Sequence, residues 1–165
     1  MPKQEIDILS LQLNPFDLIG NKWELLTAGT PEQFNTMTVS WGNMGVLWNK
    51  NICTVFVRPQ RYTLEFIERE EYFSVCTFNG HKDALALCGS KSGRDLDKIA
   101  ASGLTPAFYN GIPYFEEADL VFICKKLSVA AIQPTDFLDP SLDSKYYPEK
   151  DYHRVFTAEI VSVLR

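Results

Sequence analysis

The sequence has no apolar run near the roughly 20 residues that a membrane-spanning helix needs, and the longest run near the C-terminus covers only residues 120–124. It is also short of basic residues, with 16 Lys and Arg against 21 Asp and Glu and a formal net charge of −5. A general binder of nucleic acid or of an anionic membrane needs an excess of Lys and Arg to contact phosphates. We therefore expect no nucleic-acid partner and no membrane partner.

Cysteine and histidine are too few and too scattered for the common metal sites. The two histidines, His81 and His153, cannot supply a three-histidine zinc centre. The N-terminus lacks the charged-then-apolar pattern of a secretory signal. These features indicate a reduced, cytoplasmic protein without a metal. None of the four cysteines forms a C-x-x-C pair, the pattern typical of zinc sites and redox dithiols; they are Cys53, Cys76, Cys88 and Cys124.

The length and composition are those of a globular domain. The 165 residues are 45% hydrophobic and 13% aromatic, which is enough to bury a core without disulfides or metals. The sequence shows no internal repeat and no low-complexity segment. We therefore expect one domain over residues 1–165.

Short alternating or β-branched runs dominate the chain and predict a mainly β fold. The last of the expected helices would begin with Ser92 and Asp95 as a capping pair and end at Gly103. A parallel doubly wound sheet would need regular long crossover helices, so we predict a β-barrel with short helical insertions. The expected strands cover residues 23–27, 36–41, 52–57, 72–78, 119–132 and 155–164, and the expected helices cover residues 63–70, 81–87 and 92–101.

A glycine- and serine-rich segment, residues 88–98, is the first candidate for chemistry. It does not fit the P-loop pattern, because Gly89 and Gly93 are only four residues apart, and a lysine holds the central serine position of a nucleophile elbow. A small-residue loop that leads into a helix, with Arg94 and Lys98 on one helix face, can bind a phosphate. The same residues also fit a serine-capped, solvated helix, and the residues alone leave both interpretations open.

A second candidate is a pair of arginines. Arg58 and Arg61 flank a turn after an expected strand, and Thr63 would cap the helix that follows. Two arginines beside a helix N-terminus can recognise an anion. Alternatively, both are surface side chains whose stems lie along the protein.

A third candidate is the strand over residues 35–42. It places the hydroxyls of Thr36, Thr38 and Ser40 on one face and apolar side chains on the other. This arrangement suits a flat, partly polar ring, but half-buried strands commonly have the same pattern.

The C-terminal histidine is open to two interpretations. His153 precedes the last expected strand, where it can act as a base or a cofactor contact, or can serve a structural role. A Ser-His-Asp arrangement with Ser90 or Ser92 is compatible with the sequence, but no feature points to it.

Taken together and in this order, these segments resemble the flavin reductase-like family, and within it the flavoredoxin-type proteins that bind FMN on a split β-barrel. The more specific stretches are R-P-x-R-Y-T and G-S-x-S-G-R-D-x-D-K, and the likeness extends over roughly residues 16 to 164. The matching segments are residues 35–41, 57–63, 73–75, 89–95 with Lys98, 151–153 and 158–160.

The resemblance implies a bound FMN. On this sequence, Asn35, Met37, Thr38 and Trp41 would line the ring and ribityl chain, while His153 would also approach the flavin. The phosphate end would be held by Arg61, Tyr62, Thr63, Ser90, Ser92 and Lys98. The full set of expected cofactor-binding residues is Asn35, Thr36, Met37, Thr38, Val39, Ser40, Trp41, Arg58, Arg61, Tyr62, Thr63, Cys88, Gly89, Ser90, Ser92, Lys98 and His153.

The resemblance further implies an NAD(P)H-dependent flavin reductase, in which hydride passes to flavin N5 and no side chain acts as a nucleophile. Backbone N–H groups over residues 36–40 would stabilise the developing negative charge. The sequence has no G-x-G-x-x-G fingerprint, and an electron carrier of flavoredoxin type, reduced by a partner protein, is the alternative. A flavin-free binding module is the third possibility.

The resemblance also implies a homodimer with the flavin near the interface. Several relatives extend beyond the position of Arg165 with an aromatic residue that covers the flavin, and Trp48 and Tyr114 are the candidate substitutes here. The aromatic residues expected at the interface are Phe108, Tyr109, Tyr114 and Phe115.

Overall fold

The computed structural model describes residues 2–165. Its strands are β1 (Glu5–Ile6), β2 (Glu24–Gly29), β3 (Phe34–Val39), β4 (Gly42–Leu47), β5 (Lys50–Val57), β6 (Tyr72–Thr77), β7 (Pro106–Tyr109), β8 (Ile112–Phe115), β9 (Leu120–Ala131) and β10 (Arg154–Leu164). Its α-helices are α1 (Pro15–Asp17), α2 (Thr63–Arg69), α3 (Lys82–Ser90), α4 (Lys98–Ser102) and α5 (Pro140–Tyr146). Short 3-10 or π turns cover Ile8–Ser10, Leu18–Lys22 and Pro134–Asp136.

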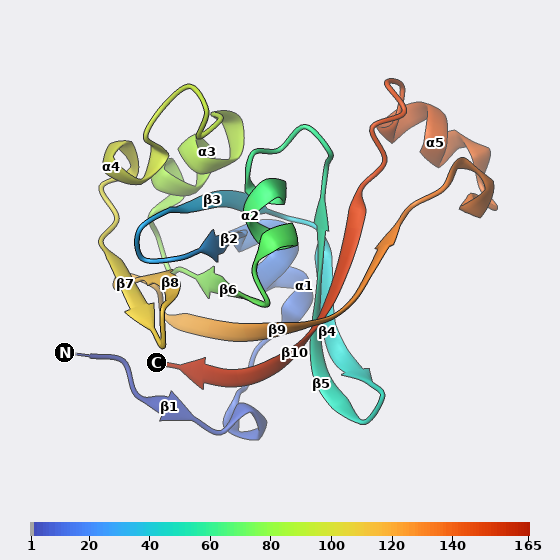
Figure 1. The fold of residues 1–165 in the computed structure, drawn as a ribbon. Helices are drawn as coiled ribbons and strands as arrows, with labels where there is room; N and C mark the ends of the chain where they lie inside the picture. The colour runs from blue at the N-terminus through green and yellow to red at the C-terminus, as the bar shows by residue number, and fades with distance from the viewer. Residues whose placement is uncertain (1) are drawn as a thin grey trace.

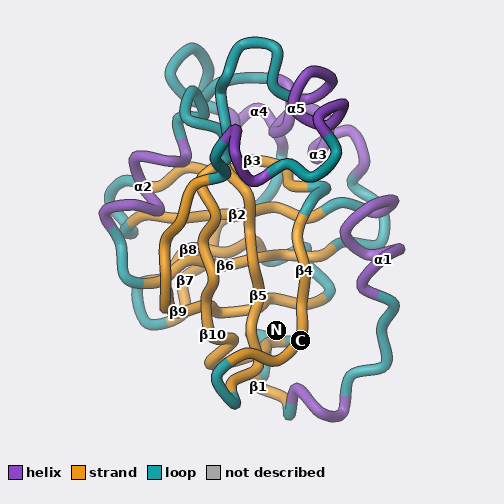
Figure 2. The backbone as a smooth tube through the Cα atoms, turned by 90° about the vertical axis from the view of Figure 1, so that its right-hand side faces the viewer, coloured by secondary structure: helices purple, strands orange, loops and turns teal. Residues whose placement is uncertain are grey.

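The main sheet is a split barrel (Figures 1 and 2). Its strands follow the order β3-β2-β6-β9-β10-β5-β4, with β1 added on β10, and every neighbouring pair is antiparallel. The two outermost strands, β3 and β4, are joined by only Ser40 and Trp41. A sheet whose two edges are joined by two residues must curl back on itself. The expected mainly β split barrel with short helical insertions is therefore confirmed.

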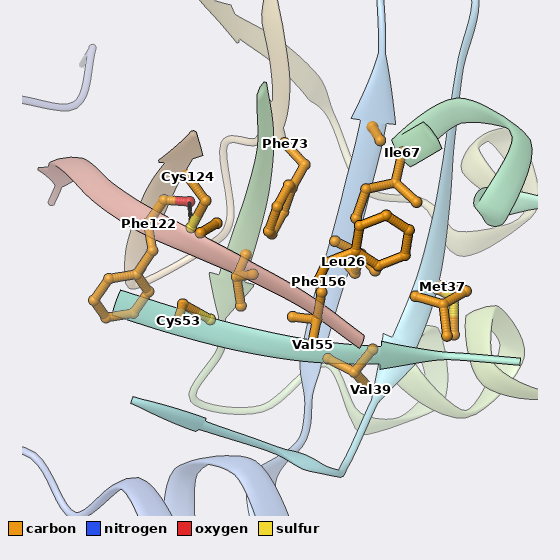
Figure 3. Close-up of a cluster of buried hydrophobic side chains, with 14 of the residues drawn as sticks. Leu26, Met37, Val39, Cys53, Val55, Ile67, Phe73, Phe122, Cys124 and Phe156 are labelled. Carbon is orange, nitrogen blue, oxygen red and sulfur yellow. Dashed lines mark hydrogen bonds between the residues drawn. The ribbon is translucent and has the colours of Figure 1, made fainter. Parts of the chain in front are cut away.

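Alternating side chains fill the inside of the barrel, because successive residues of a strand point to opposite faces. Leu26, Met37, Val55, Phe73 and Phe156 belong to this buried cluster (Figure 3). Burial of such apolar surface contributes about 25 cal/mol per Å² and holds the strands in register.

A second buried cluster lies between the barrel and its helical side. Leu25 and Cys76 project from the sheet and pack with Leu85 of α3 and Phe115 of β8. As a result, α3, α4 and the β7–β8 hairpin cover one side of β2 and β3 (Figure 1).

All six expected strands are present, but the prediction omitted β1, the β7–β8 hairpin and the edge strand β4. The β7–β8 hairpin turns at Asn110 and Gly111, both with positive φ, and Asn-Gly is the common signal of such a two-residue turn. The edge strand β4 contains two glycines and leaves Val46, Leu47 and Trp48 exposed at its end. Glycine weakens a strand pattern, which explains why β4 was not predicted.

Two helix boundaries differ from expectation. Helix α4 begins at Lys98 with Asp97 as its N-cap, not at Ser92, although it ends at Gly103 in the left-handed conformation as predicted. Ser92 accepts instead from the backbone N–H of Arg94 within a turn. Thr63 starts α2 but makes no cap bond; its hydroxyl accepts from the side-chain amide of Asn35 at 2.8 Å.

The excursion between β9 and β10 extends away from the barrel and carries α5 (Figure 1). It brings Tyr147, Tyr152 and Phe137 together in an aromatic group with ring centroids 5.0 to 6.3 Å apart. Within residues 2–165, no helix combines the length and the apolar character that a membrane crossing requires.

Candidate functional site

A pocket of about 290 Å³ opens where β3 reaches the split of the barrel. It brings together eight of the residues expected at the cofactor and adds Phe56 of β5. The lining residues are Met37, Thr38, Val39, Ser40, Trp41, Phe56, Arg58, Arg61 and His153. Polar and aromatic groups therefore meet at the barrel edge, as a binding site for a flat polar ligand requires.

One wall of the pocket is β3, which is an edge strand. It pairs with β2 alone, so among the described residues its second edge makes no ladder hydrogen bonds. The hydroxyl of Thr38 donates to the carbonyl of Leu85 in α3. A Cβ at Gly89 would lie 3.2 Å from Thr38 Cβ, tighter than an ordinary van der Waals contact, so glycine suits this close approach of α3.

The opposite wall is aromatic. Trp41, 46% exposed, has its ring centroid 5.3 Å from that of His153 and 5.4 Å from that of Tyr146. His153 is 6% exposed, and its Nδ1 lies 2.7 Å from the hydroxyl of Tyr147. Burial, together with the nearby Arg58, lowers the pKa of His153 to about 4, so the imidazole is neutral at physiological pH.

Arg58 ties this aromatic wall to β5. Its guanidinium pairs with Asp151 at 2.9 Å and donates to the carbonyl of Tyr146 at 3.0 Å. It also lies 5.0 Å from the ring centroid of Tyr147. With both terminal nitrogens engaged in this way, Arg58 positions residues 146–151 beside the pocket.

Arg61 and Lys98 converge at the C-terminal end of α3. Arg61 donates to the carbonyls of Gly89 and Cys88, at 2.9 and 3.4 Å, and Lys98 donates to that of Cys88 at 3.1 Å. Lys98 is only 3% exposed, and neither cation pairs with a carboxylate among the described residues. Desolvation, reinforced by the neighbouring Arg61 charge, lowers the pKa of Lys98 to about 8. Two cations without an acidic partner are an arrangement that can bind an anion.

Some expected residues lie outside this pocket. Asn35, Tyr62 and Lys98 line a neighbouring hollow of about 450 Å³ beneath residues 93–99. Tyr62 packs under the guanidinium of Arg94, at 4.7 Å. Thr63 is buried on Asn35.

The remaining expected residues have structural partners. The hydroxyl of Thr36 is buried and lies 2.9 Å from that of Thr27. Ser90 donates to the carbonyl of Leu87 at 3.5 Å, and Ser92 closes its own turn. Cys88 and Gly89 contact Arg61 and Lys98 through their carbonyls rather than their side chains.

The aromatic residues considered as a cover for the flavin lie elsewhere in the fold. Trp48, in the β4–β5 turn, and Tyr114, in the second core, are not among the residues that line the pocket. Tyr114 and Phe115 are also buried, so neither offers an exposed surface to a partner subunit. Phe56 and Tyr147 were missed because they lie in segments without a motif and reach the site only through the tertiary fold.

Comparison with known proteins agrees with this fold. The sequence model of the flavin reductase like domain matches residues 19–165, and the chain therefore belongs to the flavin reductase-like family. Among curated proteins, no sequence matches.

Three solved structures illustrate the shared fold. An FMN-binding domain of a flavin reductases-like enzyme from Shewanella baltica is 18% identical, with 99% of this chain and 76% of that chain covered and a TM-score of 0.70. Flavoredoxin from Methanosarcina acetivorans is 23% identical, with 86% and 67% covered and a TM-score of 0.65. An NADH:FAD oxidoreductase from Streptomyces globisporus, in complex with NAD and FAD fragments, is 12% identical, with 87% and 74% covered and a TM-score of 0.65.

Proposed function

We propose that the protein is an FMN-binding flavin oxidoreductase that accepts hydride from NADH or NADPH. The observation that carries this proposal is the pair formed by Arg61 and Lys98, two cations without an acidic partner among residues 2–165, beside an aromatic pocket. A phosphate fits the cations and a flat ring fits the pocket. Membership of the flavin reductase-like family supports the same conclusion.

The chain's own residues divide the work of binding. Lys98 and Arg61 offer charge-assisted donors to the phosphate, and Trp41 and His153 offer ring surfaces beside β3. The free edge of β3 offers backbone N–H groups where negative charge develops. When bound, FMN supplies the two-electron chemistry of the reaction. The protein holds and orients FMN. Because His153 is neutral, the positive charge of the site stays with Arg61 and Lys98 at the phosphate and is absent from the imidazole beside the flavin ring.

An electron carrier of flavoredoxin type is the second candidate. The fold similarity to flavoredoxin from Methanosarcina acetivorans favours it. The similarity to an NADH:FAD oxidoreductase favours a reductase to the same degree. In the carrier, a partner protein would reduce the same bound FMN, so the pocket assignment is unchanged.

A single preparation tests both candidates. We expect the purified protein to be yellow, or to become so with added FMN, and to release FMN identified by mass. Anaerobic stopped-flow mixing with NADH and with NADPH then follows the loss of flavin absorbance. Fast bleaching by either donor supports the reductase, and no bleaching by both supports the carrier. A colourless protein that does not bind added FMN overturns the proposal and leaves a flavin-free binding module.

We also propose that the protein is a cytoplasmic homodimer. The exposed apolar residues Val46, Leu47 and Trp48 at the end of the β4–β5 hairpin support a partner surface there. Sedimentation at micromolar concentration should give twice the chain mass of 18.8 kDa. A stable monomer would contradict this.

A further inference from the structure

The contact between Tyr147 and His153 fixes where the imidazole carries its proton. Tyr147 follows α5, His153 precedes β10, and the hydroxyl oxygen lies 2.7 Å from Nδ1. Both side chains are buried, and their rings are nearly perpendicular, at 83°, with centroids 5.5 Å apart. This is the length of a well-formed hydrogen bond between a hydroxyl and a ring nitrogen.

The direction of this hydrogen bond follows from the two groups. A buried phenol must place its proton on an acceptor, and among residues 2–165 the hydroxyl of Tyr147 has no acceptor other than Nδ1. Burial raises the pKa of Tyr147, so the phenol keeps its proton. A neutral imidazole that accepts at Nδ1 carries its own proton at Nε2.

The Nε2 atom of His153 is not fully buried. His153 lines the pocket beside Trp41. Among the described residues, Nε2 has no hydrogen-bond partner. The buried side-chain atoms without a partner in residues 2–165 are an oxygen of Glu24 and an oxygen of Asp151, so Nε2 is not one of them. Nε2 is therefore the ring nitrogen that remains available to a ligand of the pocket that His153 lines.

The surroundings keep this pair in place. Arg58 lies over the Tyr147 ring at 5.0 Å and pairs with Asp151, which also accepts from Gln60 at 2.8 Å. Arg58 and Asp151 are the charged groups nearest to the pair. The segment that carries Tyr147 is thus fixed to β5 independently of the hydroxyl.

We propose that Tyr147 is a positioning residue, whose hydroxyl donates to Nδ1 of His153 and holds the imidazole in the Nε2–H tautomer, so that His153 presents a neutral hydrogen-bond donor to the pocket. Such a donor suits a ligand atom that is a pure acceptor, such as a ring carbonyl oxygen. Its identification with an acceptor of the flavin ring rests on the proposed function, whereas the tautomer itself does not.

The tautomer is directly measurable, because the chain has only two histidines. Long-range ¹H–¹⁵N spectra of the ligand-free protein should show His153 with an unprotonated Nδ1 and a protonated Nε2 from pH 6 to 8. In Tyr147→Phe, which keeps the ring but removes the hydroxyl, His153 should become a mixture of tautomers. His81, which packs on Phe78 elsewhere, should be unchanged and serves as the internal reference.

Tyr146→Phe is the matched control, because the Tyr146 ring also packs at this wall, against Trp41, but its hydroxyl does not contact His153. Its His153 spectrum should equal that of the wild type. A wild-type spectrum with the proton on Nδ1, or an unchanged spectrum in Tyr147→Phe, overturns the proposal. The wild-type spectrum alone suffices for this decision if the variant does not fold.

FMN titration separates this inference from the proposed function. Loss of the fixed donor should weaken FMN binding to Tyr147→Phe by about 3- to 10-fold, the range for one hydrogen bond. Tyr146→Phe should keep the wild-type affinity. If the fixed tautomer is present but FMN does not bind, the proposed function fails and the tautomer stands. If FMN binds but the tautomer is mixed, the inference about Tyr147 fails alone.

Discussion

The ammonium of Lys98 and the guanidinium of Arg61 donate to the same oxygen, the carbonyl of Cys88, at 3.1 and 3.4 Å. This carbonyl belongs to the last turn of α3, where the helix dipole places partial negative charge. A carbonyl offsets only part of two positive charges. The end of α3 therefore holds both cations close together while leaving net positive charge for a ligand.

Lys98 should distinguish FMN from riboflavin, which lacks the phosphate. We expect Lys98→Met to weaken FMN binding by about 10- to 100-fold, the range for a charge-assisted hydrogen bond, and to leave riboflavin binding unchanged. Fluorescence titration with both flavins measures this. Lys91→Met, at an exposed position of the same loop, is the control and should bind both flavins as the wild type does. Equal losses for both flavins would place the phosphate elsewhere.

The affinity for FMN should also depend on pH through Lys98. Its pKa is lowered to about 8 by desolvation, so the free protein loses this positive charge as the pH rises above that value. Because a phosphate binds the charged form, the dissociation constant should increase by up to about tenfold per pH unit above pH 8. The same titration of Lys98→Met should be flat from pH 7 to 9. A flat wild-type profile would show that Lys98 does not face the phosphate.

Gly93 should be required for the loop before α4 to pack against the barrel. A Cβ at this position would clash with Oδ1 of Asn35 and lie 3.0 Å from Cδ2 of Tyr62. Gly93→Ala should therefore lower the free energy of unfolding by about 1 to 3 kcal/mol, the usual cost of overpacking. Urea denaturation measures this. Gly20→Ala, whose Cβ would meet no atom within 4 Å, should leave the stability nearly unchanged; equal effects would mean that the contact with Asn35 is unimportant.

The contact between Gly93 and Asn35 also explains why the sequence predicts the end of α4 but not its start. A serine followed by charged residues predicts a helix from Ser92, yet the helix begins only at Lys98. Gly93 packs on Asn35, and Arg94 donates to Glu65 at 2.7 Å and to the carbonyl of Gln60 at 3.1 Å. These contacts with distant residues fix the segment as a loop, and local propensity contains no information about them.

In the candidate site, too, some residues could be predicted from the sequence and others could not. Arg61, Lys98 and His153 lie in recognisable segments and were predicted, and the structure brings Arg61 and Lys98 together at one helix end. Phe56 and Tyr147 carry no pattern of their own. Tyr147 reaches His153 only because Arg58 and Asp151 hold the excursion after β9 against β5, and a pairing of this kind becomes visible only in three dimensions.

Glu24 is a buried acid outside the candidate site. It is 2% exposed on β2, on the same barrel-facing side as Leu26, and its Oε1 has no hydrogen-bond partner among the described residues. Its neighbours across the sheet are Val39 and Thr77, neither of which carries a charge. Desolvation therefore raises the pKa of Glu24 to about 8.

This raised pKa predicts the direction in which stability changes with pH. Between the usual carboxyl pKa of 4.5 and about 8, folded Glu24 keeps a proton that the unfolded chain has released. Stability must therefore fall as the pH rises through this range. His153, with its pKa lowered from 6.5 to about 4, has the opposite effect below pH 6.5. Lys98 acts only above about pH 8, so the effect of Glu24 is clearest between pH 6.5 and 8.

Glu24→Gln removes the titrating group while keeping its shape. Over this window the wild type should lose about 2 kcal/mol of unfolding free energy, since one proton corresponds to about 1.4 kcal/mol per pH unit. Glu24→Gln should lose little over the same window. Urea unfolding at pH 6.5 and 8 measures this, with the exposed Glu32 as the control position: Glu32→Gln should keep the wild-type slope. An equal slope in Glu24→Gln would mean that Glu24 is ionised inside the barrel.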